Sequence, residues 1–98
     1  KLRVMDVVMF FKRVPSVNYK DLNKDDVIVD VREVSEYRMN HIPKSKNIPL
    51  SKISTYKSDK PVYVICASGA RSKRAVKILR SNGIEAYNIR GGMLSVKR

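Results

Sequence analysis

Cysteine is almost absent from this chain, which has one cysteine, Cys66, among 98 residues. A single cysteine cannot form an internal disulfide, so the sequence excludes the small secreted domains that disulfides hold together. A lone thiol also indicates a reducing compartment, and we expect the cytoplasm. No second thiol of the chain could resolve an oxidised or sulfur-loaded Cys66. Any partner thiol must therefore belong to another molecule.

The chain also lacks the run of about 20 apolar residues that a membrane-spanning helix needs. Its most apolar stretch, residues 2–14, is shorter and is interrupted by Arg3, Asp6, Lys12 and Arg13. No small-residue cleavage site follows it, which argues against a signal peptide. Three interpretations stay open: a helix docked on the domain, a helix lying on a membrane surface, or the end of a longer chain. We expect a docked helix in residues 1–14 and a domain over residues 15–98.

Acidic residues are scarce, because 9 Asp and Glu oppose 21 Lys and Arg and the formal net charge is +12. After Cys66 the only acidic residue is Glu85. The basic residues there are Arg71, Lys73, Arg74, Lys77, Arg80, Arg90, Lys97 and Arg98. Such an excess can attract small anions, acidic proteins or nucleic acid, or can be a solvated basic face. Without an aromatic ladder, an RNA-binding motif or zinc-ligand spacing, nucleic acid is the least favoured of these partners.

The remaining sequence alternates between β-prone and helix-prone segments. The predicted strands, rich in β-branched and aromatic side chains, are residues 27–31, 46–49, 62–65 and 85–89. The predicted helical segments are residues 19–22, 35–39, 51–56 and 71–80, with a last short one that begins at Gly91-Gly92. Asn82-Gly83 is a good end for the longest of them. This alternation is typical of an α/β domain with a parallel sheet covered by helices.

Cys66 lies where the strand at 62–65 meets the helix at 71–80, at the start of Cys66-Ala67-Ser68-Gly69-Ala70-Arg71-Ser72. At such a crossing, backbone N–H groups can point into one concavity and the helix presents the positive end of its dipole. Gly69 can adopt positive φ, and Arg71 adds a permanent cation. These features favour the thiolate, the nucleophilic form of cysteine. The alternative is a small buried hydrophobe, which is what most free cysteines are.

Several segments, in their order and spacing, resemble the rhodanese-like family. They are Asp30-Val31-Arg32-Glu33, Glu36-Tyr37, His41-Ile42-Pro43, Asn47-Ile48-Pro49-Leu50, the Cys66 stretch, and Tyr87-Asn88-Ile89-Arg90-Gly91-Gly92-Met93. The resemblance implies a five-stranded parallel sheet with helices on both faces, in single-domain form. It also implies a sulfurtransferase whose cysteine accepts a sulfane sulfur as a persulfide and passes it to cyanide or a thiol. No metal or organic cofactor is needed for that reaction.

The length of the loop that begins at the cysteine distinguishes members of the family. It has six residues in sulfurtransferases and seven in the related phosphatases and arsenate reductases. The loop from Cys66 to Arg71 has six, which fits one sulfur atom better than a tetrahedral phosphate. We therefore expect Cys66 to be catalytic and a substrate-binding loop formed by Ala67, Ser68, Gly69, Ala70, Arg71 and Ser72. The alternatives are a non-catalytic interaction module and, less favoured, a small phosphatase or arsenate reductase.

Single residues of this site carry separate expectations. Arg71 is expected to face the loop, where it would stabilise a bound anion or brace carbonyl groups, although it could be a charge on the helix surface. Ser68 and Ser72 either cap the helix or donate a hydrogen bond to the persulfide. For Asp30 and Arg32, at the end of a strand, the resemblance implies a structural role in bracing loops.

Two further expectations concern the segment before the second predicted strand. His41, the only histidine, is expected to bond locally rather than to act as a base. Asn40 stands where many family members have glycine, and it tolerates the left-handed region; residues 44–46 also depart from the family and leave the shape of this turn open. The sulfur donor would be thiosulfate or a persulfide, the acceptor a thiol or cyanide, and the chain a monomer or weak homodimer.

Overall fold

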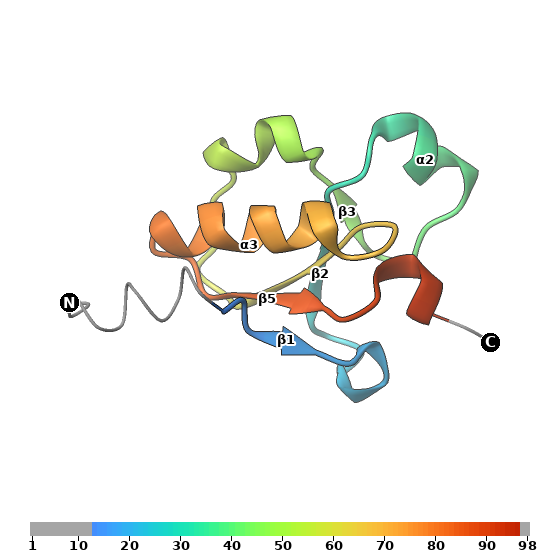
Figure 1. The fold of residues 1–98 in the computed structure, drawn as a ribbon, viewed down its shortest axis with the longest axis horizontal. Helices are drawn as coiled ribbons and strands as arrows, with labels where there is room; N and C mark the ends of the chain where they lie inside the picture. The colour runs from blue at the N-terminus through green and yellow to red at the C-terminus, as the bar shows by residue number, and fades with distance from the viewer. Residues whose placement is uncertain (1–12, 97–98) are drawn as a thin grey trace.

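The computed structural model describes residues 13–96 and builds them around one five-stranded sheet (Figure 1). The strands are β1 (Ser16–Val17), β2 (Val27–Asp30), β3 (Lys46–Asn47), β4 (Val62–Ile65) and β5 (Ala86–Ile89). They lie in the order β1-β5-β4-β2-β3, and all four pairs of neighbours are parallel. Within residues 13–96, the α-helices are α2 (Val34–Met39) and α3 (Ala70–Ser81). The same described part also has the short 3-10 helices η1 (Tyr19–Asp21), η2 (Leu50–Thr55) and η3 (Gly92–Ser95).

The sheet separates two apolar cores, because successive side chains of a strand point to opposite faces. In the larger core, Val62 and Val64 of β4 pack with Ala75, Val76 and Leu79 of α3, and all five are 0% exposed. Both α3 and η2 lie over this face of the sheet, as Figure 1 shows. The smaller core on the opposite face is centred on Ile42, Ile65 and Ile89, and η1 and η3 add Tyr19 and Met93 to it. The expected α/β architecture, with helical segments on both faces, is confirmed.

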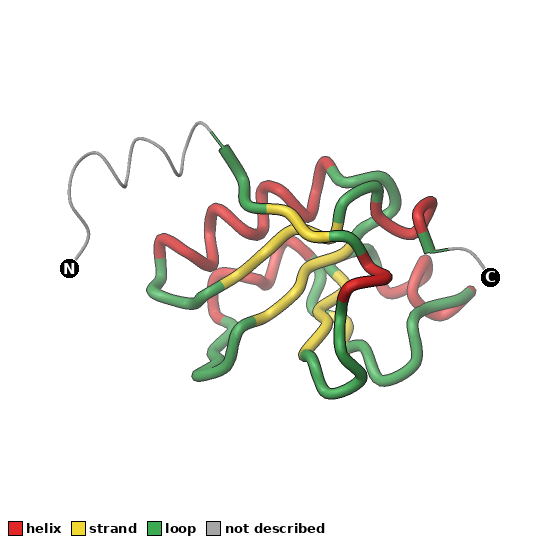
Figure 2. Tube along the Cα trace, turned by 90° about the horizontal axis from the view of Figure 1, so that it is seen from below, coloured by secondary structure: helices red, strands yellow, loops and turns green. Residues whose placement is uncertain are grey.

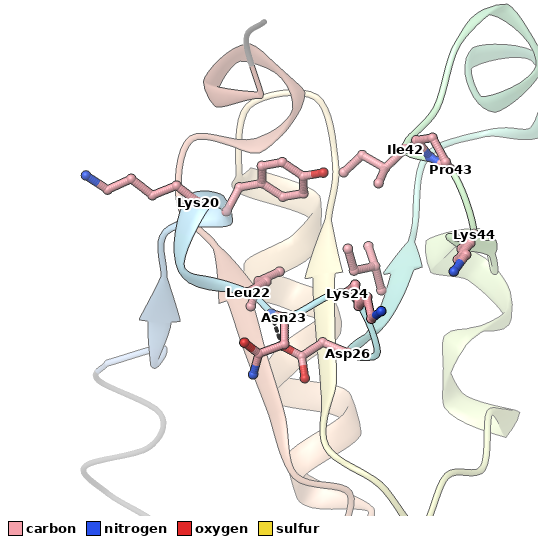
Figure 3. A pocket seen from close by; sticks show the side chains of 10 residues that line it. Lys20, Leu22, Asn23, Lys24, Asp26, Ile42, Pro43 and Lys44 are labelled. Atoms are coloured by element: carbon pink, nitrogen blue, oxygen red, sulfur yellow. Dashed lines mark hydrogen bonds between the residues drawn. The ribbon is translucent and has the colours of Figure 1, made fainter.

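A hollow of about 420 Å³ lies beside the smaller core (Figure 3). Its lining comes from η1, the chain between η1 and β2, Ile28 of β2 and residues 42–44, so it is formed without the Cys66 loop. Leu22 and Ile42 supply apolar surface, and Lys20, Lys24 and Lys44 supply positive charge. Figure 2 shows the strands side by side, seen from below, with helical segments around them.

Strand β1 is the element that the residue pattern did not predict. Ser16 and Val17 pair with Asn88 and Ile89 of β5, and the backbone N–H of Asn88 also donates to the carbonyl oxygen of Pro15. Two residues are too few to show an alternating pattern, so only the neighbouring strand defines β1 as a strand. Four strands were predicted from the residues, and the fifth was implied by the family resemblance alone.

Helix α3 follows the sequence prediction closely. Its apolar residues recur at spacings of three and four, which places Ala75, Val76 and Leu79 on one buried face. Asn82 is the C-cap, and Gly83 continues in the left-handed region with φ +84°. The N–H of Gly83 donates to Arg80, and that of Ile84 donates to Leu79. This is the helix end that Asn-Gly predicts.

The turn before β3 differs from the expectation for Asn40. Asn40 has φ −168°, which is extended backbone, and Lys44 takes the left-handed conformation with φ 71°. The Asn40 carbonyl oxygen accepts a hydrogen bond from Arg32, and this contact fixes the extended backbone there. A glycine is therefore not needed at position 40.

The helix expected in residues 1–14 falls mainly on residues 1–12, which lie outside the described part of the chain. Val14 is described, and it packs against the larger core. Among residues 13–96 there is no helix with the length and apolar character to cross a membrane.

The packing of α3 gives a first prediction. Leu79→Ala removes a side chain that is 0% exposed in the larger core, so it should lower the free energy of unfolding by about 2–5 kcal/mol. Leu94→Ala is the matched control, because Leu94 is 69% exposed and its loss should cost no more than about 0.5 kcal/mol. Urea unfolding followed by circular dichroism measures both. Equal losses for the two variants would contradict this packing.

Candidate active site

The site lies where the chain leaves two neighbouring strands in opposite directions. After β2 it passes through α2 to β3 at one edge, and after β4 it passes through α3 to β5 on the other side. In open parallel sheets, ligands bind beyond the carboxyl ends of the strands at such a switch point. Cys66 follows β4 directly, and residues 31–33 follow β2, so both segments meet at this switch point.

The Cys66 side chain points toward α3 and is surrounded by backbone N–H groups. Cys66 lies two residues after Val64 and therefore faces the same side of the sheet as Val62 and Val64. The residue is 1% exposed. The N–H of Gly69 lies 3.1 Å from Cys66 Sγ, and that of Ser72, in the first turn of α3, lies 3.3 Å from it. Gly69 has φ +122°, which turns the loop back toward the sulfur and which a residue with a side chain rarely adopts. The converging N–H groups predicted for this loop are present.

Two opposing effects set the acidity of Cys66. Burial raises the pKa of the thiol, because a charged sulfur is poorly solvated there. Hydrogen bonds from the Ser72 side chain and from the backbone of Ser72, Gly69 and Ser68 lower it by more. The pKa of Cys66 is therefore below its ordinary value. This direction favours the reactive thiolate.

Ser72 contacts the sulfur with its side chain as well as its backbone. Its Oγ lies 3.4 Å from Cys66 Sγ, 3.1 Å from the carbonyl oxygen of Gly69 and 2.5 Å from Oδ1 of Asn88. The helix begins after Gly69 without a side-chain cap, so capping does not account for Ser72. Ser68 is exposed and only its backbone acts on the sulfur.

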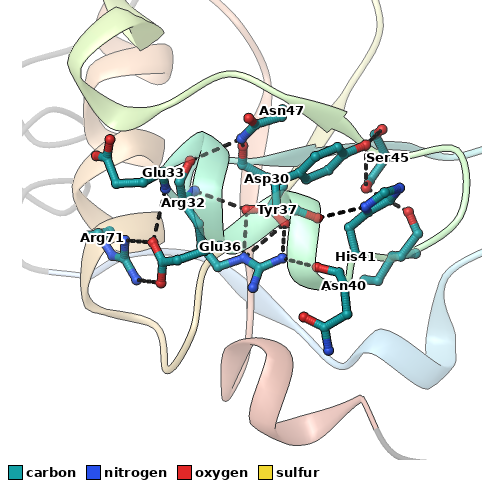
Figure 4. Close-up of polar contacts among 11 residues, drawn as sticks. Asp30, Arg32, Glu33, Glu36, Tyr37, Asn40, His41, Ser45, Asn47 and Arg71 are labelled. Carbon is teal, nitrogen blue, oxygen red and sulfur yellow. Dashed lines mark hydrogen bonds and ion pairs between the residues drawn. The ribbon is translucent and has the colours of Figure 1, made fainter.

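Arg71 lies at the end of the loop, but its guanidinium is bound by a carboxylate (Figure 4). Its two terminal nitrogens lie 2.6 and 3.0 Å from the two carboxylate oxygens of Glu36 in α2. These hydrogen bonds raise the pKa of Arg71, and attraction to Cys66 adds a weaker effect in the same direction. The pair ties the two loops of the switch point together. Glu36 was not predicted as a site residue, since nothing in its local sequence indicates a partner 35 positions away.

Asp30 and Arg32 form a buried ion pair beneath the same loops (Figure 4). The Arg32 guanidinium donates to both carboxylate oxygens of Asp30 and to the carbonyl oxygen of Asn40. Asn47 of β3 donates from its amide to the carbonyl oxygens of Asp30 and Arg32. These contacts hold the chain after β2 against β3. They are the kind of contacts that a bracing role for Asp30 and Arg32 requires.

A turn from the end of β5 packs directly on the Cys66 loop. The N–H of Met93 donates to the carbonyl oxygen of Cys66 at 2.8 Å, and that of Leu94 donates to Ala67 at 3.3 Å. A Cβ atom on Gly92 would lie 2.5 Å from both of these carbonyl oxygens, and Gly92 has φ +59°. The sequence predicted only that Gly91-Gly92 begins a helix. Its contact with the active loop could not be seen from the residues.

The basic residues after Cys66 differ in their contacts and in their exposure to solvent. Arg80 donates to the carbonyl oxygen of Ala86 and lies over the Tyr87 ring, and Arg90 donates to Asn18. Lys73 and Arg74 of α3 are exposed. Lys97 and Arg98 lie outside the described residues.

His41 is occupied by local contacts (Figure 4). Its ring stacks on Tyr37 with 3.8 Å between ring centroids, and its Nδ1 lies 2.8 Å from the Tyr37 carbonyl oxygen. Residues 13–96 contain no group of three or more His, Cys, Asp or Glu side chains arranged to hold a metal ion.

Comparison with known proteins agrees with this geometry. Residues 15–98 match the family described as the rhodanese-like domain. A thiosulfate sulfurtransferase, GlpE, from Pseudomonas savastanoi pv. phaseolicola is 33% identical over 84% of this chain and 83% of its own length. The crystal structure of a rhodanese-like domain protein from Staphylococcus aureus matches with a TM-score of 0.76 and 35% identity, over 84% of this chain and 90% of that one.

The chain belongs to the rhodanese-like family. Proteins named as sulfurtransferases, and one named as a putative sulfur carrier, are among its relatives. The uncharacterized protein YqhL of Bacillus subtilis is 46% identical over 66% of this chain, which spans 56% of that protein. The chain spans 14% of a tRNA sulfurtransferase from Desulfurococcus amylolyticus, at 33% identity.

The contact between Gly92 and the loop predicts a specific defect in Gly92→Ala. The added Cβ must displace the Cys66 and Ala67 carbonyl groups. The rate at which iodoacetamide alkylates Cys66 should therefore fall on the order of a hundredfold. Gly83→Ala is the matched control, because Gly83 has φ +84° with open space around it. That variant should lose only about 1–2 kcal/mol of unfolding free energy. A Gly92→Ala protein with normal alkylation would contradict the clash.

The Glu36–Arg71 pair predicts a pH-dependent contribution to stability. Hydrogen bonds from Arg71 lower the pKa of Glu36 from its ordinary value of 4.5 to about 2. The stabilisation is therefore complete above pH 4.5 and is lost as the pH falls through about 2. Because the Glu36 side chain is 35% exposed, it should amount to less than about 1 kcal/mol.

Glu36→Gln tests this, since glutamine keeps an acceptor for the N–H of Glu33 but loses the charge. Urea unfolding at neutral pH should show a loss that disappears near pH 2. Asp25→Asn removes an exposed charge as a control and should show no such loss. A Glu36→Gln loss that is unchanged at low pH would exclude an ion pair as its cause.

Proposed function

We propose that this chain is a sulfurtransferase that carries one sulfane sulfur on Cys66. The observation that supports it most is the convergence of the Gly69 and Ser72 N–H groups, at 3.1 and 3.3 Å, on a thiol whose pKa is lowered. The same groups can bind the negative charge of a persulfide. The loop residues Ala67 to Ala70 have only small side chains or none.

In the first step, the Cys66 thiolate attacks the outer sulfur of thiosulfate. A bond forms between the two sulfur atoms, and sulfite leaves with the electron pair of the sulfur–sulfur bond of thiosulfate. The product is a Cys66 persulfide with a terminal negative charge. Fixed N–H dipoles stabilise this charge without having to reorganise. A low-molecular-weight or protein persulfide could serve as donor by the same displacement, with a thiolate as leaving group.

In the second step, an acceptor attacks the outer sulfur of the persulfide. Cyanide yields thiocyanate, a thiolate yields a new persulfide, and each returns Cys66 to the thiolate. Lys73 and Arg74, exposed on α3, would raise the local concentration of anionic donors. The similarity to a named thiosulfate sulfurtransferase supports thiosulfate as donor, and the relative named as a putative sulfur carrier protein supports a protein acceptor. No cofactor takes part, and a reducing compartment would keep Cys66 available.

Mass spectrometry tests the persulfide. After incubation with thiosulfate, the protein should gain the mass of one sulfur atom, and cyanide should remove it. Cys66→Ala is the control and should gain none. A wild-type protein that never gains this mass, or a Cys66→Ala protein that does, would overturn the proposed function and leave the interaction module as the alternative. Hydrolysis of an aryl phosphate by the same protein would instead favour a phosphatase.

A further inference from the structure

A line of polar side chains leads from the Cys66 sulfur to the edge strand of the sheet. Ser72 Oγ lies 3.4 Å from Cys66 Sγ and 2.5 Å from Asn88 Oδ1, and Asn88 Nδ2 lies 3.1 Å from Ser16 Oγ. Ser72 and Asn88 are 0% and 1% exposed, so water cannot readily replace these contacts. Ser16 of β1 is the register partner of Asn88 of β5, so the pairing of the two strands sets their contact.

When Cys66 is a thiol, the hydrogen bonds run outward from the sulfur. The S–H donates to Ser72 Oγ, and the Ser72 hydroxyl donates to Asn88 Oδ1. The Asn88 amide then donates to Ser16 Oγ, whose hydroxyl donates to the carbonyl oxygen of Val14 at 3.3 Å. A hydroxyl carries one proton, so Ser72 has none left for the sulfur in this arrangement.

A thiolate sulfur has no proton, so it can accept hydrogen bonds but cannot donate one. If Ser72 turns its proton to Cys66, two oxygen atoms, Ser72 Oγ and Asn88 Oδ1, are left 2.5 Å apart with no proton between them. Half a turn of the Asn88 amide removes this repulsion. Nδ2 then donates to Ser72, and Oδ1 accepts from the Ser16 hydroxyl. An amide can do this because its donor and acceptor ends have nearly the same shape.

We infer that Asn88 is a positioning residue for Cys66, and that its amide turns to direct the Ser72 hydroxyl at the sulfur when the thiol gives its proton to solvent. No other proton leaves its residue: the hydroxyls of Ser72 and Ser16 rotate, and the amide turns. The whole chain of hydrogen bonds reverses direction between the two charge states. The inference rests on the proposed function only in that the thiolate is the reacting form.

The charged groups near the sulfur stay constant in the test. Among the described charged side chains, Arg71 is attracted to Cys66, and Glu36 holds Arg71 from α2, with Glu33 acting on Arg71 more weakly. The variants below leave all three in place. A change in the pKa of Cys66 therefore reports on its hydrogen bonds.

Asn88→Leu removes both ends of the amide and should raise the pKa of the Cys66 thiol by about one unit, which is about a tenfold smaller thiolate fraction at neutral pH. The ¹³C shift of the Cys66 Cβ against pH measures this without ambiguity, because the chain has one cysteine. Asn23→Leu is the matched control on an exposed asparagine and should leave the pKa unchanged.

A double substitution separates positioning from a structural effect. Ser72→Ala alone should raise the pKa of Cys66 at least as much as Asn88→Leu, and adding Asn88→Leu to it should change nothing further. An unchanged pKa in Asn88→Leu, or an equal rise in the Ser72→Ala background, would overturn the inference.

A measurement on the unsubstituted protein covers the case in which Asn88→Leu does not fold. With ¹⁵N-labelled asparagine, the side-chain amide signals of Asn88 should shift at the same pH as the Cys66 Cβ, and Cys66→Ser should abolish that shift. Amide signals that do not follow Cys66 would contradict the inference. Neither titration requires sulfur transfer, so a protein that fails to load sulfur but shows this coupling would refute the proposed function alone.

Discussion

The active loop depends on keeping backbone N–H groups aimed at a buried sulfur. Cys66 is 1% exposed, and a buried thiolate is costly unless hydrogen bonds replace its hydration. Gly69 and Ser72 supply these bonds, but only while the loop keeps the positive φ of Gly69 and the first turn of α3 stays in place. The rest of the domain can be understood as the support for this one turn.

That support comes from three directions. Below the loop, β4 and the larger core fix the position of Cys66. On one side, the turn after β5 binds the carbonyl groups of Cys66 and Ala67, and Gly92 allows the two backbones to approach closely. On the other side, Glu36 holds Arg71 and so links α3 to α2. The Glu36 carboxylate offsets the positive charge of Arg71. The N–H dipoles of the loop therefore supply a larger share of the stabilisation of a charged sulfur than they would beside an unpaired arginine.

The elements of the fold could be predicted where their own residues carry a pattern. Helix α3, strand β4 and the end of α3 at Asn82-Gly83 were predicted with nearly correct limits, because apolar spacing and capping are local properties. Strand β1 could not be predicted, since two residues carry no pattern and β5 alone makes them a strand. For the same reason the left-handed backbone conformation, which asparagine tolerates, was expected at Asn40 but is not found there. The backbone of Asn40 follows instead from a contact with Arg32.

By itself the sequence determined the kind of site: a single cysteine between a strand and a helix, a glycine that lets the loop curl, and a six-residue spacing to Arg71. Only the tertiary structure decided which groups surround that sulfur. Glu36, Asn88 and Gly92 reach the loop from other elements, and the first two meet their partners across 35 and 16 positions of sequence. The physical reason is that spacing along the chain fixes backbone geometry over a few residues. The direction of a hydrogen bond or an ion pair between separate elements depends on how the sheet brings them together.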